Sequence, residues 1–397
     1  MKVCIIGGGA SGLVAAITAA ERGNEVTLYE RQARVGRKLM STGNGRCNLT
    51  NMGCSIEHYH GADAAFIRPA LDAFGAEEAM EFFSQLGLIT VAEPSGRVYP
   101  FSDQAGSVLD VLRFRCDALG VVTRTGAEVR RIKKRADGFE VETEEEKALF
   151  DRVIIACGGA AGAKVGGISL GYELLRAFGH RITELRPALV QVKTDAKFIK
   201  SLKGVRAQAG VELIKGGKTI MTGRGEVQLT EYGLSGPAIF DISRWASEGC
   251  EIRLDLAPDM GKKELIDYLR RRTAELPELT AEDILTGFLH NRLGSTAVRY
   301  AGVNLNTKLS ALSFTDVLKI ADAVKGFTAK VYGTLGFDAA QVTCGGADVG
   351  EFDPQTLESR LIPGLYACGE VLDVDGDCGG YNLAWAWASG RRAGELR

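Results

Sequence analysis

Three glycines near the start of the chain, Gly7, Gly9 and Gly12, fit the pattern G-x-G-x-x-G that can bind the pyrophosphate of a dinucleotide. They lie between a strand-like run, KVCII, and an Ala-rich, helix-like run, and Glu30 closes the next strand-like run, EVTLYE. In such a unit the first glycine makes a tight turn, the second lets the backbone approach the pyrophosphate, and the third brings helix and strand together. The helix N-terminus attracts negative charge, and Glu30 would accept hydrogen bonds from a ribose. Strand, helix and acid together predict a dinucleotide site rather than an ordinary glycine-rich turn.

The segment 36–51, GRKLMSTGNGRCNLTN, is too rich in glycine and polar residues to form a core element. An extended loop of this kind can follow the phosphate, ribityl and flavin parts of FAD. Arg37, Lys38 and Arg46 are available there for charge, and Asn48 for hydrogen bonds. A solvated surface loop is the alternative that these residues leave open.

A third segment, near the C-terminus, combines the strand-like run GLYACGE with an acidic loop and a second pair of glycines, Gly379 and Gly380. Glu370 can bind ribityl hydroxyl groups. The glycine pair precedes a helix that we expect to open at about Asn382. The N-terminus of that helix can face the N1–C2 carbonyl edge of a flavin, where its partial positive charge would stabilise the anionic reduced form.

The rest of the chain supplies the elements that must position these residues. Residues 1–30 read as strand, glycine-rich turn, helix and strand. The pattern then predicts helical segments at about 64–86 and 105–119, an antiparallel meander over 121–155, short strands of a small barrel or sandwich up to about 257, and a charged helical region over 258–323. Since no repeat or low-complexity linker separates these parts, we expect the middle of the chain to be inserted into one domain.

Four motifs spread over the whole chain resemble one family: GGGASGLVAA, SxGNGRCNLTN, GLSGPAIFDIS and GEVLDVDGxCGGYNLAWAWASG. It is the family of bacterial FAD-binding oxidoreductases known as BaiN-like or aminoacetone-oxidase-like flavoproteins. The resemblance implies an α/β fold, with a glutathione-reductase-type FAD-binding Rossmann-like domain, an inserted small β-barrel and a helical insert. The implied domains are 1–190 and 344–397 for FAD, 191–257 and 325–343 for the barrel, and 258–324 for the helical insert.

The resemblance implies non-covalent FAD and carries the family's flavin contacts over to matching positions, with Val129 holding the adenine through its backbone. Two stretches depart from the family pattern and bear on the substrate pocket more than on the flavin: KVGGISLGYELL (164–175) in place of a Gly-Ser-Thr-Gly-Asp-Gly-type run, and TCGGA (343–347) in place of Thr-x-Gly-Gly-Val. The implied contacts are Gly7, Gly9, Ser11, Gly12, Glu30, Arg31, Lys38, Gly45, Arg46, Cys47, Asn48, Val129, Ala156, Gly158, Gly369, Glu370, Asp373, Gly380, Tyr381, Asn382 and Leu383.

Composition and charge exclude several classes of protein. The net charge of −2 over 397 residues favours neither a nucleic acid nor an anionic membrane as partner. No apolar run approaches the length of a membrane span, and the apolar start of the chain is too short for a signal segment. Nine cysteines without a C-x-x-C pair indicate a reduced protein, so the cytoplasm is the expected location. The oligomeric state stays open.

Cys54, His58 and His60 lie close together in the sequence and raise the question of a metal. With four histidines in the chain and no recurring ligand spacing, we expect no metal site. Cys47 is expected to pack against the flavin ring rather than to act as a redox thiol, because no resolving cysteine lies at C-x-x-C spacing.

The chain contains one complete dinucleotide unit, because the second glycine-rich turn, ACGGAAG (156–162), is not followed by a βαβ unit that ends in an acid. A reduced nicotinamide would therefore reach the flavin face transiently. The leading hypothesis is hydride transfer through flavin N5, with NAD(P)H as donor, to a small or steroid-like organic substrate. The inserted region would roof the isoalloxazine ring.

Two other functions stay open. One is an FAD-dependent amine oxidase that passes electrons to oxygen, and the other is a flavoprotein that binds RNA or a protein partner through its charged helical insert. The basic run 270–272 stands among acidic residues, which argues against nucleic acid. No catalytic acid or base is assigned; the candidates for orienting a substrate carbonyl are Arg46, Asn48, Tyr99 and Tyr381.

Overall fold

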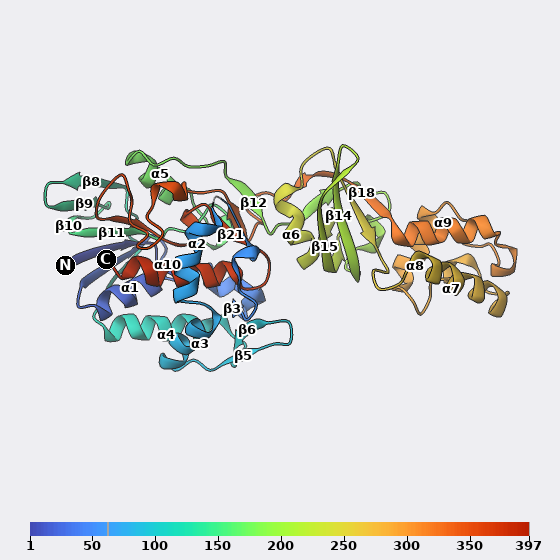
Figure 1. Cartoon of the computed structure of the whole chain (residues 1–397), viewed down its shortest axis with the longest axis horizontal. Helices are drawn as coiled ribbons and strands as arrows, with labels where there is room; N and C mark the ends of the chain where they lie inside the picture. The colour runs from blue at the N-terminus through green and yellow to red at the C-terminus, as the bar shows by residue number, and fades with distance from the viewer. Residues whose placement is uncertain (62, 397) are drawn as a thin grey trace. The chain divides into compact units, whose positions relative to one another are not determined.

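The structure is a computed structural model that describes residues 1–61 and 63–396. The chain forms two compact units, Met1–Pro187 with Ala340–Arg397 and Ala188–Ala339, and the first unit contains both chain ends (Figure 1). Ala62 and Arg397, which the expected FAD domain includes, lie outside the described residues. The three-part division at about 190, 257, 325 and 343 stays a prediction.

A parallel sheet forms the centre of the first unit, in the order β20-β11-β1-β2-β7. The central strand β1 is apolar, and Val3 to Ile6 are buried because neighbouring strands and helices cover both faces. This sheet confirms the expected Rossmann-like α/β fold. Its strands are β1 (Lys2–Ile6), β2 (Glu25–Glu30), β7 (Val122–Thr125), β11 (Arg152–Ile155) and β20 (Leu365–Ala367).

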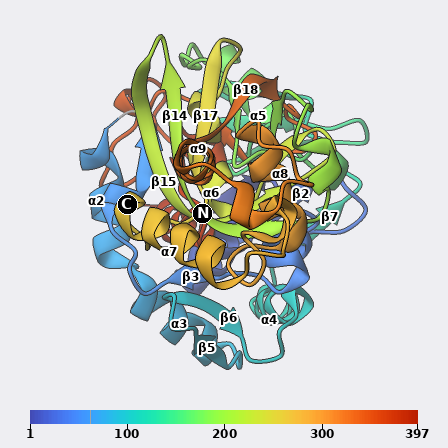
Figure 2. The same ribbon diagram turned by 90° about the vertical axis from the view of Figure 1, so that its right-hand side faces the viewer.

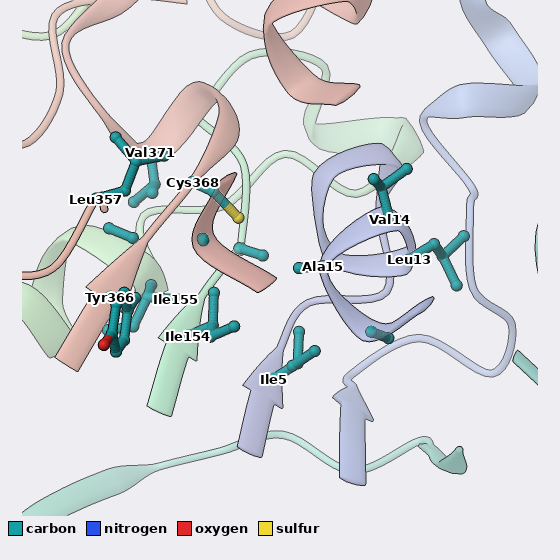
Figure 3. Packing of buried hydrophobic residues seen from close by; sticks show 14 of the residues in the cluster. Ile5, Leu13, Val14, Ala15, Ile154, Ile155, Leu357, Tyr366, Cys368 and Val371 are labelled. Carbon is teal, nitrogen blue, oxygen red and sulfur yellow. The ribbon is translucent and has the colours of Figure 1, made fainter. Parts of the chain in front are cut away.

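Helices cover this sheet, and the first helix of the chain, α1, packs against the last, α10. Figure 3 shows Ala15 of α1 over Ile5 and Ile154, which come from β1 and β11. The segment expected to be helical over 64–86 forms two helices, because the backbone leaves the helical conformation at Phe74, the C-cap of the first, and at Gly75, the N-cap of the second. The helices are α1 (Ala10–Glu21), α2 (Ala64–Ala73), α3 (Ala76–Gln85), α4 (Ala105–Ala118), α5 (Leu170–Ala177) and α10 (Tyr381–Gly394).

Smaller sheets complete the first unit. The antiparallel meander expected over 121–155 is present only as β8-β9-β10, because β7 and β11 at its two ends pair in parallel in the central sheet. Short ladders join β3-β6-β5, β21-β4 and β12-β19, so segments far apart in the sequence lie side by side. The strands are β3 (Thr50–Asn51), β4 (Tyr59–Gly61), β5 (Thr90–Ala92), β6 (Arg97–Pro100), β8 (Arg131–Arg135), β9 (Gly138–Glu142), β10 (Lys147–Phe150), β12 (Arg186–Ala188), β19 (Val342–Cys344) and β21 (Val374–Gly376).

The second unit is a closed antiparallel barrel, β13-β16-β15-β14-β17-β18, with a helical segment between β17 and β18 (Figures 1 and 2). Along β14 the buried residues alternate with partly exposed ones, as expected where one face of a strand lines a barrel core. The expected inserted barrel is thus confirmed. The elements are β13 (Val192–Thr194), β14 (Arg206–Lys215), β15 (Lys218–Leu229), β16 (Gly233–Ser235), α6 (Pro237–Ile242), β17 (Cys250–Asp255), α7 (Lys262–Glu275), α8 (Asn291–Tyr300), α9 (Phe314–Lys325) and β18 (Phe327–Thr334).

Candidate flavin site

The dinucleotide turn lies between β1 and α1, and its three glycines have different environments. A side chain on Gly7, whose φ is +111°, would collide with the carbonyl oxygen of Ala156, and one on Gly12 would collide with the carbonyl oxygen of Gly7. A Cβ built on Gly9 meets no atom within 4 Å among the described residues. Gly7 and Gly12 are therefore required by the packing of the turn itself, whereas Gly9 leaves room for a ligand beside the start of α1.

A pocket lies at the ends of β1 and β2, where the adenosine of a dinucleotide is expected. Its lining includes Glu30, Arg31, Ala127, Val129 and Gly166. The Glu30 carboxylate accepts hydrogen bonds from the backbone N–H groups of Gly8 (2.9 Å) and Gln32 (2.7 Å), so its position is fixed. The Arg31 guanidinium donates to the carbonyl oxygen of Gly166 (3.1 Å) and closes the pocket on one side.

Lys38 and Glu370 come together although 332 residues separate them in the sequence. Lys38 Nζ lies 2.6 Å from Glu370 Oε2, and Glu370 Oε1 accepts a hydrogen bond from the Thr343 backbone N–H (2.8 Å). We expected Lys38 to provide charge for a phosphate and Glu370 to bind the ribityl chain. The pair joins the second and third predicted segments, and beside it Gly158, at φ +72°, would meet no described atom within 4 Å if it carried a Cβ.

The loop after α1 and β2 has an unusual backbone. Asn44 and Cys47 adopt φ values of 58° and 62°, which are uncommon for residues with a side chain, and the glycines between and before them are also left-handed. Such conformations cost free energy and persist where surrounding contacts fix them, frequently at ligand sites. Segment 36–51 therefore has a defined backbone, while Arg37, Met40 and Ser41 are exposed in it, and its place along the flavin stays a prediction.

Arg46 and Tyr99, two of the expected substrate-orienting residues, are in contact. The Arg46 guanidinium carbon lies 3.9 Å from the Tyr99 ring centroid, and the same group pairs with Asp103 and with Glu93 (3.1 Å). Hydrogen bonds to Asp103 and Glu93 raise the pKa of Arg46 above its ordinary value. Arg46 is thus permanently charged and held by two carboxylates, so its charge is largely balanced before any ligand is present.

The loop that follows Cys47 packs against the start of α10. Trp387 Nε1 donates to the Leu49 carbonyl oxygen (2.9 Å), and Asn51 Nδ2 donates to the Gly379 carbonyl oxygen (2.9 Å). Asn48 Oδ1 and Thr50 Oγ1 are buried and have no hydrogen-bond partner among the described residues. Buried polar atoms normally have a partner, so these two oxygens leave hydrogen-bonding capacity for a polar ligand at this turn.

The turn Gly376–Asn382 presents the N-terminus of α10. Asn382 closes it by bonding through Nδ2 and Oδ1 to the backbone of Gly376, each at 2.8 Å. Gly380, the N-cap residue, is left-handed (φ 105°) and, as a glycine, has no side chain with which to cap the helix. The backbone N–H groups in the first turn of a helix have no partner within the helix, so this end of α10 suits an acceptor or a negatively charged ring.

The structure thus brings the three predicted segments into one unit around space left by glycines and around unpartnered polar atoms, and these features fit FAD. The sequence did not reveal two features of this region: the buried Thr50, whose Oγ1 has no hydrogen-bond partner among the described residues, and the contact of His58 with Asp377. The expected residues in the first unit are the flavin contacts named above together with Tyr99.

The pair His58 and His60 does not form a metal site with Cys54. Both imidazoles contact Asp377, whereas Cys54 Sγ contacts the Tyr59 hydroxyl at 3.2 Å. No cluster of three or more potential ligands suited to a metal occurs within residues 1–61 and 63–396. Within the same residues, no helix combines the length and the apolar character that a membrane crossing requires.

Cys47 is expected to resist alkylation in the folded protein. The residue is fully buried, and burial raises the pKa of its thiol to about 12, so at pH 8 it is protonated. In the unfolded chain the Cys47 thiol has its ordinary pKa of about 8.5, so the fold, which favours the neutral thiol, keeps the full contribution to stability below that pH. The contribution is lost as the pH rises from about 8.5 toward 12, because the unfolded thiol then ionises before the folded one. Peptide mapping after iodoacetamide treatment at pH 8 should find Cys47 unmodified in folded protein and modified in urea. Rapid labelling of folded protein would contradict a packing role.

Comparisons with known proteins show the family and the fold of the chain. A family model described as HI0933-like protein Rossmann domain matches residues 1–396. The chain is 39% identical over 401 residues to the 3-dehydro-bile acid delta(4,6)-reductase of Clostridium scindens, which covers 99% of this chain and 98% of that protein. It is 29% identical over 385 residues to the ribosomal RNA dihydrouridine synthase of Escherichia coli, and the match covers 97% of this chain and 95% of that protein. A crystal structure of 3-ketosteroid delta1-dehydrogenase from Sterolibacterium denitrificans shares the fold, with a TM-score of 0.50 at 13% identity over 99% of this chain and 98% of that one.

Proposed function

The chain belongs to the family of HI0933-like Rossmann proteins and is an FAD-dependent oxidoreductase, and from that premise we propose that it saturates a carbon–carbon double bond conjugated with a carbonyl group. The proposed substrate is a small, steroid-like molecule, and the proposed electron donor is NAD(P)H. The observation that carries this proposal is the 39% identity to the Clostridium scindens bile acid reductase over nearly all of both chains.

The names of the two kinds of relative support one shared reaction type. One is a reductase of 3-dehydro-bile acids, and the other forms dihydrouridine in ribosomal RNA. Both names describe the reduction of a carbon–carbon double bond, in a 3-dehydro-bile acid and in a uridine base. A site that serves this reaction needs a hydride source, a means of holding the carbonyl, and a proton donor.

When bound, FAD would supply the hydride, and the residues of this chain would hold the cofactor and the substrate. Gly9 and the start of α1 would receive the pyrophosphate, Glu30 the adenosine ribose, and the Lys38–Glu370 pair the ribityl region. The N-terminus of α10 would stabilise negative charge on the flavin. Since one dinucleotide unit is present in the sequence, the nicotinamide would bind transiently at the flavin face.

A second candidate is the reduction of a uridine in ribosomal RNA, which the 29% and 28% identities to the Escherichia coli and Haemophilus influenzae synthases favour. The charges of the second unit do not decide against it: many basic groups are paired with carboxylates, but exposed Lys200 and Lys218 form no ion pair with any described residue and could meet phosphate. Arg270, Arg271 and Arg272 lie near aromatic rings of Phe314 and Tyr268. Basic residues of this unit that pair with carboxylates are Lys203, Arg206, Arg224, Arg253, Lys262, Lys308, Lys319 and Lys325.

Anaerobic titration tests the proposed function. We expect NADH or NADPH to bleach the flavin of the purified holoprotein, and testosterone, a conjugated steroid ketone, to restore the oxidised spectrum. A flavin that neither nicotinamide bleaches would overturn the proposed donor. A chemically reduced flavin that testosterone and cyclohexenone both leave reduced would overturn the proposed reaction.

Two further additions separate the alternatives. Restoration of the spectrum by a uridine-containing ribosomal RNA fragment, with no response to either ketone, would favour the RNA candidate. Release of hydrogen peroxide from an amine under air would favour the amine oxidase. Saturated testosterone identified by mass spectrometry is the product that the proposed function requires.

A further inference from the structure

Four charged or titratable side chains lie on one face of the ladder formed by β4 and β21. His60 is the direct partner of Asp375, and the Asp377 backbone N–H donates to the His58 carbonyl oxygen, so His58 and Asp377 are the next pair along. Side chains two residues apart in a strand point to the same side. Two histidines of one segment therefore face two aspartates of a segment that is more than 300 residues away in the chain.

Asp377 holds both imidazoles, but through different nitrogens. Its Oδ2 lies 3.1 Å from His58 Nδ1, and its Oδ1 lies 2.7 Å from His60 Nε2. The His58 ring also stacks on Tyr381, with 4.2 Å between centroids and 17° between planes. The ring plane and the Nδ1 side of His58 are thus both fixed, while 37% of its side chain stays exposed.

These contacts leave His58 Nε2 available. It forms no hydrogen bond to any residue that the structure describes, whereas the Nε2 of His60 is occupied by Asp377. An imidazole with Nδ1 held by a carboxylate and Nε2 open is the arrangement in which histidine transfers a proton to or from a ligand. Of the two histidines, His58 is therefore the one able to do so.

The cluster is part of the turn that is expected to face the flavin. Asp377 lies between Gly376 and Asn382, and Asn382 Nδ2 bonds to the backbone of both Gly376 (2.8 Å) and Asp377 (3.3 Å). Tyr381, on which His58 stacks, is the first residue of α10. His58 is thus connected directly to the helix N-terminus that would meet the isoalloxazine, in the region where a substrate would lie over the ring.

We propose that His58 is the catalytic acid of the reaction and that Asp377 and Tyr381 are its positioning residues. The inference rests on the proposed function. Saturating the conjugated bond takes a hydride at the carbon β to the carbonyl, which the reduced cofactor supplies, and a proton at the α carbon. His58 gives that proton from Nε2 as the alkene π pair forms the new C–H bond, and the neutral imidazole regains a proton from water.

Oxidation of the chemically reduced holoprotein by two acceptors tests the role of His58. In His58→Gln, the anaerobic reaction with testosterone should slow by about 10²–10⁴-fold, the range for loss of a general acid. Reaction with ferricyanide, which forms no C–H bond, should keep its wild-type rate. His290→Gln is the matched control, because His290 caps α8 in the second unit, and it should leave both rates unchanged.

Labelling with diethyl pyrocarbonate gives a readout without turnover. Mass spectrometry of the oxidised holoprotein should find His58 modified and His180 unmodified, since the latter ring is fully buried between Glu351 and Ser359. Testosterone at a concentration that perturbs the flavin spectrum should protect His58. Modification of His58 at the same rate with and without the bound steroid would overturn the proposal.

The failures of the two proposals are distinguishable. Wild-type protein that testosterone and cyclohexenone do not oxidise overturns the proposed reaction. If testosterone oxidises the reduced wild-type protein and oxidises His58→Gln at the same rate, only the role of His58 is overturned. If His58→Gln does not retain FAD, Asp377→Asn decides, because it keeps the size of the side chain: a slower reaction with testosterone but not with ferricyanide supports the proposal, and unchanged rates overturn it.

Discussion

Replacing Gly9 with alanine is expected to leave the apoprotein folded and to remove its ability to retain FAD. A methyl group at this position meets no described atom within 4 Å, and the backbone angles, φ −85° and ψ −168°, suit any residue. The same methyl group would occupy the space through which the pyrophosphate reaches the start of α1. We expect the dissociation constant for FAD to rise at least about 100-fold, or about 2.8 kcal/mol, by fluorescence titration of the apoprotein.

Gly12→Ala is the matched comparison for this experiment. Its methyl group would collide with the carbonyl oxygen of Gly7, which belongs to the turn itself, so the variant should lower the stability of the apoprotein as well as FAD binding. Gly9→Ala should instead unfold at the wild-type temperature or slightly above, since alanine restricts the unfolded chain. A yellow Gly9→Ala protein with wild-type affinity would refute the placement of the pyrophosphate.

The contact between the two terminal helices should be equally sensitive. A Cβ on Gly390 of α10 would collide with the carbonyl oxygen of Ser11 in α1, and backbone on both sides leaves little freedom to shift. Overpacking of this kind typically costs about 1–3 kcal/mol and sometimes more. For Gly390→Ala we expect about 3 kcal/mol, which lowers the melting temperature of a unit of this size by roughly 6–12 °C.

Differential scanning calorimetry of the apoprotein measures this loss without any effect of the cofactor. Gly261→Ala serves as its control, because Gly261 precedes α7 in the second unit, and a Cβ there meets no described atom within 4 Å. Because Gly261 is the N-cap of α7, where alanine is less favourable than glycine, this control should lose no more than about 1 kcal/mol. Equal melting temperatures for Gly390→Ala and Gly261→Ala would show that α1 and α10 do not need this close approach.

Together the two experiments separate the stability of the folded apoprotein from its affinity for FAD. Gly390 acts on the packing of α1 against α10, which brings the dinucleotide turn near the flavin end of the site. Gly9 acts only on the ligand. If both results hold, the packing of α1 against α10 stabilises the fold and Gly9 serves FAD affinity, and free cofactor should stabilise the wild-type protein much more than Gly9→Ala.

The fold could be predicted largely from local patterns. The strand, glycine turn, helix and acid over 1–30 are consecutive, and each residue type has one physical purpose there: Gly7 and Gly12 for packing and Glu30 at the end of β2. The short strands of the meander and of the second unit were predictable from strand-like runs between turn signals, which left a barrel or a sandwich open, and the family resemblance implied the barrel. The break between α2 and α3 was missed, since the apolar pattern runs through Gly75.

The site was less predictable, because its polar side chains bind one another across large sequence separations. Arg46 pairs with Glu93 and Asp103 of the β6 region, and Lys38 pairs with Glu370. Neither pairing has a spacing that could be recognised in the sequence. Asn382 was expected to contact the flavin, and in the structure its side chain closes the turn before α10.

The amino-acid sequence by itself determined the dinucleotide turn, because the steric needs of a pyrophosphate-binding turn fall on residues that are neighbours in the chain. Only the tertiary structure decided the environment of His58. The sequence placed it beside Cys54 and His60 and raised the question of a metal, whereas the β4–β21 ladder gives both histidines the carboxylate of Asp377. Strand pairing joins residues whose separation along the chain carries no physical information, so the partners of a side chain become known only when the sheet is formed.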